Sequence, residues 1–252
     1  MTSRSDEVDG LGPAAARPGW FLRSRRLLQA ALIDKVERDH RQSDQAFVRR
    51  RIVVAVTLVI GATLLGISLS VTPGSGAFYP LTLALAGVWT IGGFASGPLH
   101  LGRIPAQNKL RRPVVVPIVV GLIASAVFVV GALIVREIGP LDRLVRSILD
   151  HAQPGALVLV ALITLLNGVA EEIFFRGALF AAIGVRLPVV ISTIVYAVAT
   201  LATGNFMLVF AAATLGVVLG LQRRASGGVL GPILTHCTWS FIMLLVLPPL
   251  FA

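Results

Sequence analysis

The chain has 252 residues, of which 56% are hydrophobic and only 13% carry a charge. Uncharged stretches of about 18 residues or more recur along it, each long enough to cross a bilayer as a helix. A soluble domain of this length could not bury so much apolar surface, so the composition predicts an integral protein of the cell membrane. The formal net charge of +10 does not indicate nucleic-acid binding, because no basic patch is interleaved with aromatic residues on a soluble module. The single cysteine excludes an intrachain disulfide.

The first 51 residues form a basic leader that holds 11 of the 22 lysines and arginines. Residues 1–18 are rich in glycine, proline, alanine and acidic residues, which is typical of a disordered tail. From Trp20 to Arg51 the pattern is amphipathic, with apolar residues at helical spacing among many charges: Leu28, Ala31, Leu32 and Val36. This segment is interpreted either as a helix lying on the inner membrane surface or as a solvated charged leader.

Seven apolar segments follow the leader and predict an all-α, polytopic fold of about seven transmembrane helices. They are 52–71, 79–97, 114–135, 156–180, 187–203, 205–222 and 229–247. With the N-terminus in the cytoplasm, 19 of the 22 lysines and arginines lie on inner segments and 3 on outer segments. The inner set outside the leader is Arg103, Lys109, Arg111, Arg112, Arg176, Arg186, Arg223 and Arg224. Because cytoplasmic loops carry an excess of Lys and Arg, this asymmetry predicts a cytoplasmic N-terminus.

The outer segment 136–155 separates the third and fourth spans and is itself amphipathic. Its apolar residues share one helix face: Leu141, Leu144, Val145, Ile148 and Leu149. We expect this segment to lie in the membrane interface and to brace the fourth span. The predicted organisation is a leader at 1–51, three accessory helices in 52–135, the interfacial segment 136–155 and a four-helix core in 156–252.

Two adjacent carboxylates close the fourth apolar run and are the most informative polar feature. The stretch from Ala156 to Ala170 carries no charge and leads directly into Glu171 and Glu172. The helix should therefore deliver both carboxylates to the edge of the low-dielectric layer, where an ionisable group usually marks a functional site. Arg176 follows Glu172 at i, i+4, a spacing at which the two side chains can pair.

Further polar residues share single helix faces in the fourth, fifth and seventh spans, where contact with lipid would be expensive. The three sets are Thr164, Asn167 and Glu171; Thr193, Tyr196, Thr200 and Thr203; and His236 and Ser240. We expect these faces to meet around a small wet cavity near the cytoplasmic side. The sixth span carries Gly216-x-x-x-Gly220, which predicts a close-packing notch.

Each of these features also has a purely structural explanation. Glu172 and Arg176 could form an ion pair at a helix end, and His236 could be a hydrogen-bonded packing residue. Threonine stripes are common between membrane helices. This explanation is weakest for Glu171, because no cation lies at i+4 from it. Glu171 is therefore the leading candidate for chemistry.

The pattern Glu-Glu-x-x-Phe-Arg-Gly at 171–177 resembles the first motif of the CAAX prenyl protease type 2 and bacteriocin-immunity family. These proteins, also called the Abi or CPBP family, are intramembrane glutamate endopeptidases, and the resemblance covers about 156–247. The family's second pattern, Phe-x-x-x-His, would fall on Tyr196 to Thr200, so the aromatic is kept and the histidine is lost. Its third pattern, His-x-x-x-Asn, would fall on His236 to Ser240, so serine replaces the asparagine.

The resemblance implies a role for each matching residue. Glu171, together with the second-motif histidine, would activate a water to attack a peptide carbonyl. His236 and Ser240 would stabilise the oxyanion that forms. Glu172 and Arg176 would hold the helix end together and orient Glu171.

Three functions are compatible with these residues. The first is an intramembrane peptidase acting on a membrane-associated protein or peptide, with Glu171 alone as general base. The second is a catalytically impaired pseudo-protease that binds such a partner without cutting it, because the Thr200 hydroxyl does not titrate near neutrality. The third is a proton or cation path through Glu171, Asn167 and His236.

Other chemistries have less support. No cofactor is implied, and a metal site is marginal, since Glu171, Glu172, His236 and Cys237 could supply only some of the required ligands. A serine nucleophile at Ser240, four residues after His236, has no supporting flanking signature. The expected partners are membrane lipid and a membrane-associated protein or peptide, with no nucleic acid.

Overall fold

The computed structural model describes residues 26, 28–30, 32–36, 42–106, 109–152 and 157–252. Within these residues, six helices are long and apolar enough to cross a membrane, which confirms the predicted all-α, polytopic fold. A seventh apolar helical segment, Pro188–Thr203, is shorter than the other six. The positions of all seven agree with the seven predicted spans to within a few residues at most ends.

In chain order, the described elements begin with two long helices and a short hairpin and continue with helices to the C-terminus. They are α2 (Asp44–Ser70), α3 (Phe78–Ala95), the strands β1 (Ile104–Ala106) and β2 (Lys109–Arg111), α4 (Val115–Val135), α5 (Gly139–Ala152), α6 (Leu157–Glu172), the π-helix η1 (Ile173–Leu179), α7 (Phe180–Ile183), α8 (Pro188–Thr200), the 3-10 turn η2 (Leu201–Thr203), α9 (Phe206–Ser226) and α10 (Leu230–Leu250). The antiparallel β1–β2 hairpin was not predicted.

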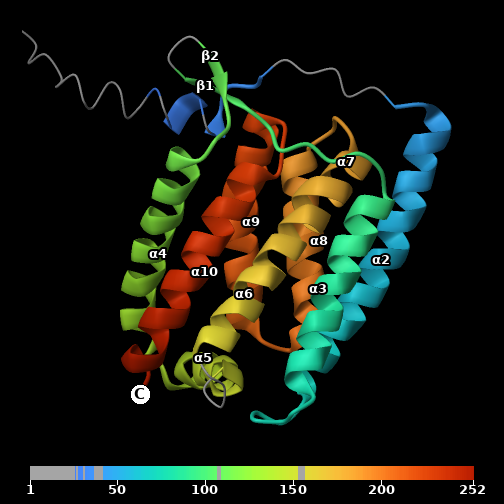
Figure 1. Ribbon diagram of the computed structural model, residues 1–252. Helices are drawn as coiled ribbons and strands as arrows, with labels where there is room; N and C mark the ends of the chain where they lie inside the picture. Colours follow the sequence, from blue (N-terminus) through green and yellow to red (C-terminus); the bar gives the residue numbers. More distant parts are fainter. Residues whose placement is uncertain (1–25, 27, 31, 37–41, 107–108, 153–156) are drawn as a thin grey trace, which may run out of the picture.

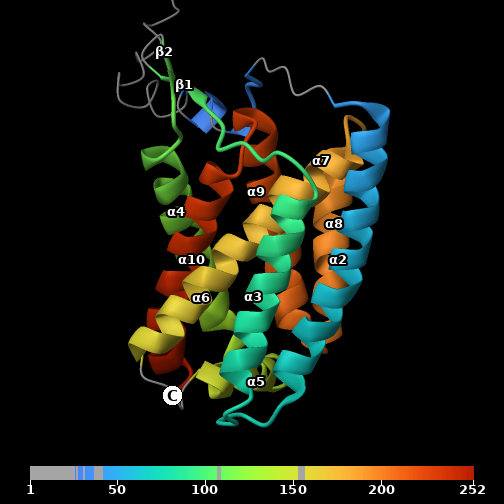
Figure 2. The same cartoon turned by 45° about the vertical axis from the view of Figure 1, so that its right-hand side comes forward.

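Helix α6 crosses the middle of the bundle and continues through η1 into α7 (Figure 1). Helices α2 and α3 lie on one side of α6, and α4 and α10 lie on the other, with α8 and α9 behind. The view turned by 45° shows the same order (Figure 2). Helix α6 packs against α3 and α10, and η1 packs against α3, α8 and α9. The polar residues near the α6–η1 junction therefore lie inside the bundle.

The basic residues divide between the two ends of the bundle, in agreement with the predicted alternation of the spans. Arg136, Arg143 and Arg146 lie at the end where α5 crosses the bundle, and the β1–β2 hairpin lies at the opposite end (Figure 1). Arg176 is an exception, because we counted it with the inner segments and it is only 1% exposed within η1. Which end faces the cytoplasm stays a prediction.

The leader differs from its prediction where the structure describes it. Helix α2 begins at Asp44 and not at residue 52, where the first span was predicted to start. The Ser43 side chain caps this helix by accepting a hydrogen bond from the backbone N–H of Ala46. Leu28 and Leu32 are helical, as the amphipathic pattern predicts, but Ala31 and the expected disordered tail at 1–18 lie outside the described residues.

The amphipathic segment between the third and fourth spans forms α5, as predicted. Its apolar face, represented by Val145 and Leu149, is buried against Ala132 of α4 and Phe251 beyond α10. Asn205, which caps α9, also donates from Nδ2 to the carbonyl oxygen of Leu144 at 2.8 Å. Helix α5 thus packs on the ends of α4, α9 and α10, whereas we expected it to brace the fourth span.

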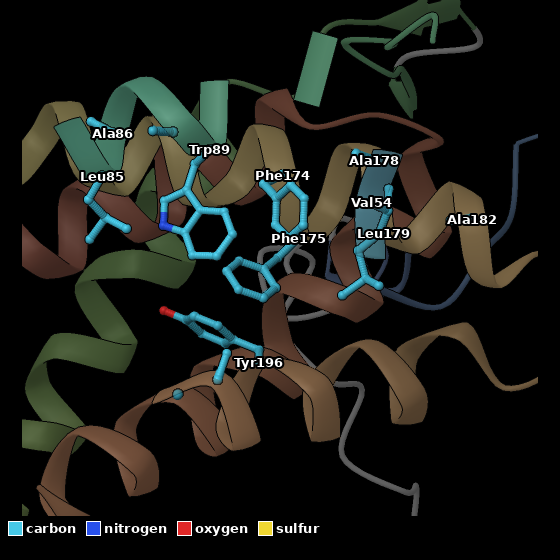
Figure 3. Close-up of a cluster of buried hydrophobic side chains, with 13 residues drawn as sticks. Val54, Leu85, Ala86, Trp89, Phe174, Phe175, Ala178, Leu179, Ala182 and Tyr196 are labelled. Atoms are coloured by element: carbon cyan, nitrogen blue, oxygen red, sulfur yellow. The ribbon is translucent and has the colours of Figure 1, made fainter. Parts of the chain in front are cut away.

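The sequence directly after the paired glutamates forms a π-helix, which was not predicted. All six residues from Phe174 to Leu179 are buried, a run too long for one face of an α-helix. The Phe175 ring lies between Trp89 and Tyr196, with ring centroids 5.1 and 4.5 Å away (Figure 3). Arg223 of α9 donates from Nε to the carbonyl oxygen of Arg176 at 2.6 Å. The π-helix is rare in proteins and often occurs at functional sites.

Close helix contacts fix the position of this segment. The predicted Gly216-x-x-x-Gly220 notch is confirmed, because a Cβ on Gly216 would lie 2.9 Å from Thr193 and one on Gly220 would lie 3.0 Å from Val189, both on α8. Gly93 of α3 makes a similar approach to η1, since its Cβ would lie 2.5 Å from Cγ2 of Ile173.

Gly93→Ala is therefore expected to lower the free energy of unfolding by about 1–3 kcal/mol, the usual cost of overpacking. The matched control is Gly131→Ala in α4, where a Cβ would meet no atom within 4 Å. Because alanine favours a helix over glycine, this control should be neutral or slightly stabilising. The stability of both variants is measured by thermal unfolding in detergent, with the alkylation of Cys237, the only cysteine, as the signal for unfolding. Equal loss of stability in the two variants would contradict the close approach of α3 to η1.

Candidate active site

The two adjacent glutamates point into different environments. Glu172 is completely buried, whereas Glu171 is partly exposed. The continuous helix runs from Leu157 to Ile183, so both carboxylates lie near its middle. The chain stays helical beyond them through η1 and α7, and their place at the edge of the apolar layer stays a prediction.

Glu172 is the centre of a buried charged cluster, which we call the triad: Glu172, Arg176 and His236. Its Oε1 accepts a hydrogen bond from Arg176 Nη1 at 2.9 Å and pairs with Nδ1 of His236 at 2.8 Å. The side chains of Glu172, Arg176 and His236 are only 0%, 1% and 8% exposed. The i, i+4 pairing predicted from the sequence is thus present, but inside the bundle and not at a helix end.

The triad leaves several polar atoms without a partner among the described residues. They are Oε2 of Glu172 and both Nε and Nη2 of Arg176, and all three are buried. Buried polar atoms are normally hydrogen-bonded, and each exception costs free energy or serves a function. Burial of the triad therefore costs free energy, and a helix bundle can be stable without such a buried charged cluster.

Glu171 has a different partner, which sequence reasoning did not identify. The hydroxyl of Tyr196 in α8 donates to Oε2 of Glu171 at 2.6 Å. The guanidinium of Arg176 lies over the Tyr196 ring, with Cζ 4.6 Å from the centroid. A signal was present in the sequence, because Tyr196 belongs to the polar stripe of the fifth span and supplies a hydroxyl where the family pattern has phenylalanine.

The polar faces of the fourth, fifth and seventh spans therefore meet, as predicted. Glu171 and Tyr196 join α6 to α8, and Glu172 and His236 join α6 to α10. Two further expectations stay predictions: that the space between these polar faces is hydrated, and that it lies near the cytoplasm.

Three other predicted site residues lie about one helical turn away from these contacts. Thr200 is buried and donates its hydroxyl to the carbonyl oxygen of Tyr196 at 2.8 Å, within its own helix. Ser240 is buried one turn beyond His236 on α10. Asn167 donates to the carbonyl oxygen of Ile163 at 3.0 Å, and its Oδ1 is buried and has no partner among the described residues. None of the three contacts a glutamate through a hydrogen bond within the described part of the chain.

The marginal metal ligands do not come together. In the part of the chain that the structure describes, no group of three or more His, Cys, Asp and Glu side chains could hold a metal ion. Cys237 points to the carbonyl oxygen of Leu165, 3.8 Å from its Sγ, and not to the glutamates.

A family profile described as Type II CAAX prenyl endopeptidase Rce1-like matches residues 153–242. Residues 153–242 of this chain are thus similar to that family. The match confirms the resemblance that we inferred from the first motif, and it includes every residue of the triad together with Glu171 and Tyr196. The Rce1-like family is a family of proteases, which are hydrolases. No curated protein and no solved structure matches the chain.

The contacts within the matched residues add to the roles that the family motifs imply. His236 was expected beside Ser240 as an oxyanion donor, yet Nδ1 of its ring is bonded to Glu172. In the family the first glutamate acts with the second-motif histidine, which this chain lacks, and the one hydrogen bond of the Glu171 side chain among the described residues comes from a tyrosine. The two glutamates of the intact first motif thus have different partners, Glu172 in the buried triad and Glu171 on a tyrosine.

Proposed function

We propose that this protein is an intramembrane endopeptidase in which Glu171 acts as general base on the water that attacks a peptide carbonyl. The observation that carries the proposal is the contrast between the two glutamates. Glu172 is buried and held by an arginine and a histidine, whereas Glu171 is partly exposed and has one oxygen, Oε1, without a partner among the described residues. Adjacent carboxyl groups in unlike environments are suited to different roles.

The triad supports this chemistry beside Glu171. A carboxylate bonded to Nδ1 fixes the ring of His236 and directs Nε2 away from Glu172. When both ring nitrogens carry a proton, the imidazolium can donate a hydrogen bond from Nε2 to the oxyanion or pass that proton to the leaving amine. In the attack, the water oxygen bonds to the carbonyl carbon, one water proton passes to Oε1 of Glu171, and the carbonyl π electrons move to its oxygen to form the oxyanion. When the carbonyl forms again, the C–N bond breaks and the leaving amine takes up a proton.

The substrate follows from the position of the site and from the family. Glu171 and His236 lie within helices long and apolar enough to cross a membrane, so a membrane-associated protein or peptide has the readiest access. The family description adds a prenylated CAAX sequence as the first substrate class to examine.

One observation favours a second candidate, a pseudo-protease that binds such a partner without cutting it. The Thr200 hydroxyl is bonded to its own helix and does not titrate near neutrality, so position 200 offers Glu171 no help in proton transfer. The two candidates differ in whether the natural chain cleaves a peptide.

Glu171→Gln is expected to lower the rate of peptide cleavage at least about a hundredfold, because glutamine keeps the size of the side chain but cannot accept a proton. The assay uses purified protein in lipid vesicles with a farnesylated peptide ending in a CAAX sequence, and the same peptide without the prenyl group. The matched control, Glu137→Gln, changes an exposed glutamate paired with Arg136 and should leave the rate unchanged. Circular dichroism checks that both variants fold. Cleavage by Glu171→Gln at the natural rate would overturn the proposal.

A further inference from the structure

The hydrogen bond between Tyr196 and Glu171 has the geometry of a strong, charge-assisted contact. Its length of 2.6 Å lies in the range typical of an O–H donor and an ionised carboxylate. It is also the one hydrogen bond of the Glu171 side chain among the described residues. The orientation of this carboxylate is therefore set mainly by one hydroxyl group.

The tyrosine is itself held firmly in place. Tyr196 is only 9% exposed, its ring packs on Phe175 with centroids 4.5 Å apart, and the Arg176 guanidinium covers the ring. Arg176 is in turn bonded to Glu172 of the triad. A tyrosine side chain has two main torsions, so these contacts leave its hydroxyl little freedom. Tyr196 thus connects the triad to the otherwise separate carboxylate of Glu171.

This arrangement also selects which carboxylate oxygen can react. Oε2 accepts the hydrogen bond from Tyr196, so Oε1 is the oxygen left to accept a proton from water. A carboxylate held in one orientation needs no rearrangement when the reaction occurs, and misplacement by about 1 Å can cost roughly 10²-fold in rate.

We infer that Tyr196 is a positioning residue that orients Glu171 in this chain, where Thr200 replaces the histidine of the family's second motif. The inference rests on the proposed function for its effect on catalysis. The tyrosine keeps its proton throughout, donates to Oε2 and takes no part in the proton transfer from water to Oε1.

The test is Tyr196→Phe, which removes one oxygen atom and keeps the ring between Phe175 and Arg176. We expect kcat for peptide cleavage to fall roughly 10–100-fold with KM unchanged, because substrate binding does not depend on the hydroxyl. The matched control is Tyr79→Phe at the start of α3, which changes the only other tyrosine and should leave kcat unchanged. Unchanged kcat in Tyr196→Phe would overturn the inference.

A second measurement tests the contact without cleavage. Dicyclohexylcarbodiimide labels protonated carboxyl groups in apolar surroundings, and mass spectrometry locates the label on Glu171. Because a donor on the carboxylate stabilises its ionised form, Tyr196→Phe should be labelled roughly tenfold faster at the same pH. Glu171→Gln gives the background and Tyr79→Phe the control rate.

Different results would contradict the proposed function and the role of Tyr196. Cleavage that survives Glu171→Gln contradicts the proposed function, whatever the labelling rate. Equal labelling of Glu171 in the natural chain and in folded Tyr196→Phe contradicts the role of Tyr196, whether or not the protein cuts a peptide.

Discussion

Thr200→His combined with Ser240→Asn should raise the rate of peptide cleavage by roughly 10²–10⁴-fold, the usual contribution of a positioned acid or base. Thr200 is buried one helical turn beyond Tyr196, the residue that contacts Glu171, so we expect a longer side chain at position 200 to reach this carboxylate. An imidazole at this position can accept the proton of the attacking water, which the threonine hydroxyl cannot do. An asparagine one turn beyond His236 adds an amide donor on a longer arm than serine for the oxyanion.

The control for this experiment places an imidazole elsewhere on the same helical segment. Thr203→His combined with Ser240→Asn adds the same groups, but position 203 lies in η2 at the end of the segment. It should give none of the gain expected from position 200. A gain that starts from no detectable natural cleavage would identify the natural chain as the pseudo-protease. No change in the Thr200→His combination would contradict the catalytic geometry that we assign to α6, α8 and α10.

Much of the fold follows from the sequence because the bilayer imposes simple requirements. A spanning segment must satisfy its backbone internally and be about 20 apolar residues long, so hydropathy and loop charge predict helices and their alternation. The same argument failed for Arg176. The excess of Lys and Arg on cytoplasmic segments led us to count Arg176 among them. In the structure Arg176 is buried and paired with Glu172, four residues before it.

The site was less predictable because its details depend on backbone geometry and on neighbouring helices. The motif identified Glu171, Glu172, Arg176 and His236, but no periodicity argument could show that the helix becomes a π-helix after Glu172. The i→i+5 hydrogen bonds of a π-helix change the direction of the later side chains, and the whole run from Phe174 to Leu179 is buried. Which carboxylate bonds to His236 and which to Tyr196 depends on how α8 and α10 pack against α6, and a single sequence does not reveal that packing.

Glu172→Gln is expected to lower the free energy of unfolding by about 3–5 kcal/mol, the usual cost of breaking a buried ion pair. Glutamine keeps the shape of the side chain but leaves the Arg176 charge buried at 1% exposure without a counter-charge. It also weakens the bond to Nδ1 of His236. The decrease in the free energy of unfolding is measured by equilibrium unfolding in mixed micelles, monitored by circular dichroism.

The protein contains a matched control for this prediction. Asp142 and Arg146 of α5 also pair at i, i+4 with a distance of 2.9 Å, but their side chains are 19% and 46% exposed. Asp142→Asn should therefore cost no more than about 1 kcal/mol, since solvent screens an exposed pair. Adding Arg176→Met to Glu172→Gln removes the stranded charge and should restore part of the lost stability, which a simple packing defect would not allow. Equal losses for Glu172→Gln and Asp142→Asn would show that burial does not strengthen the pair, and the triad would then have no special place in the stability of the bundle.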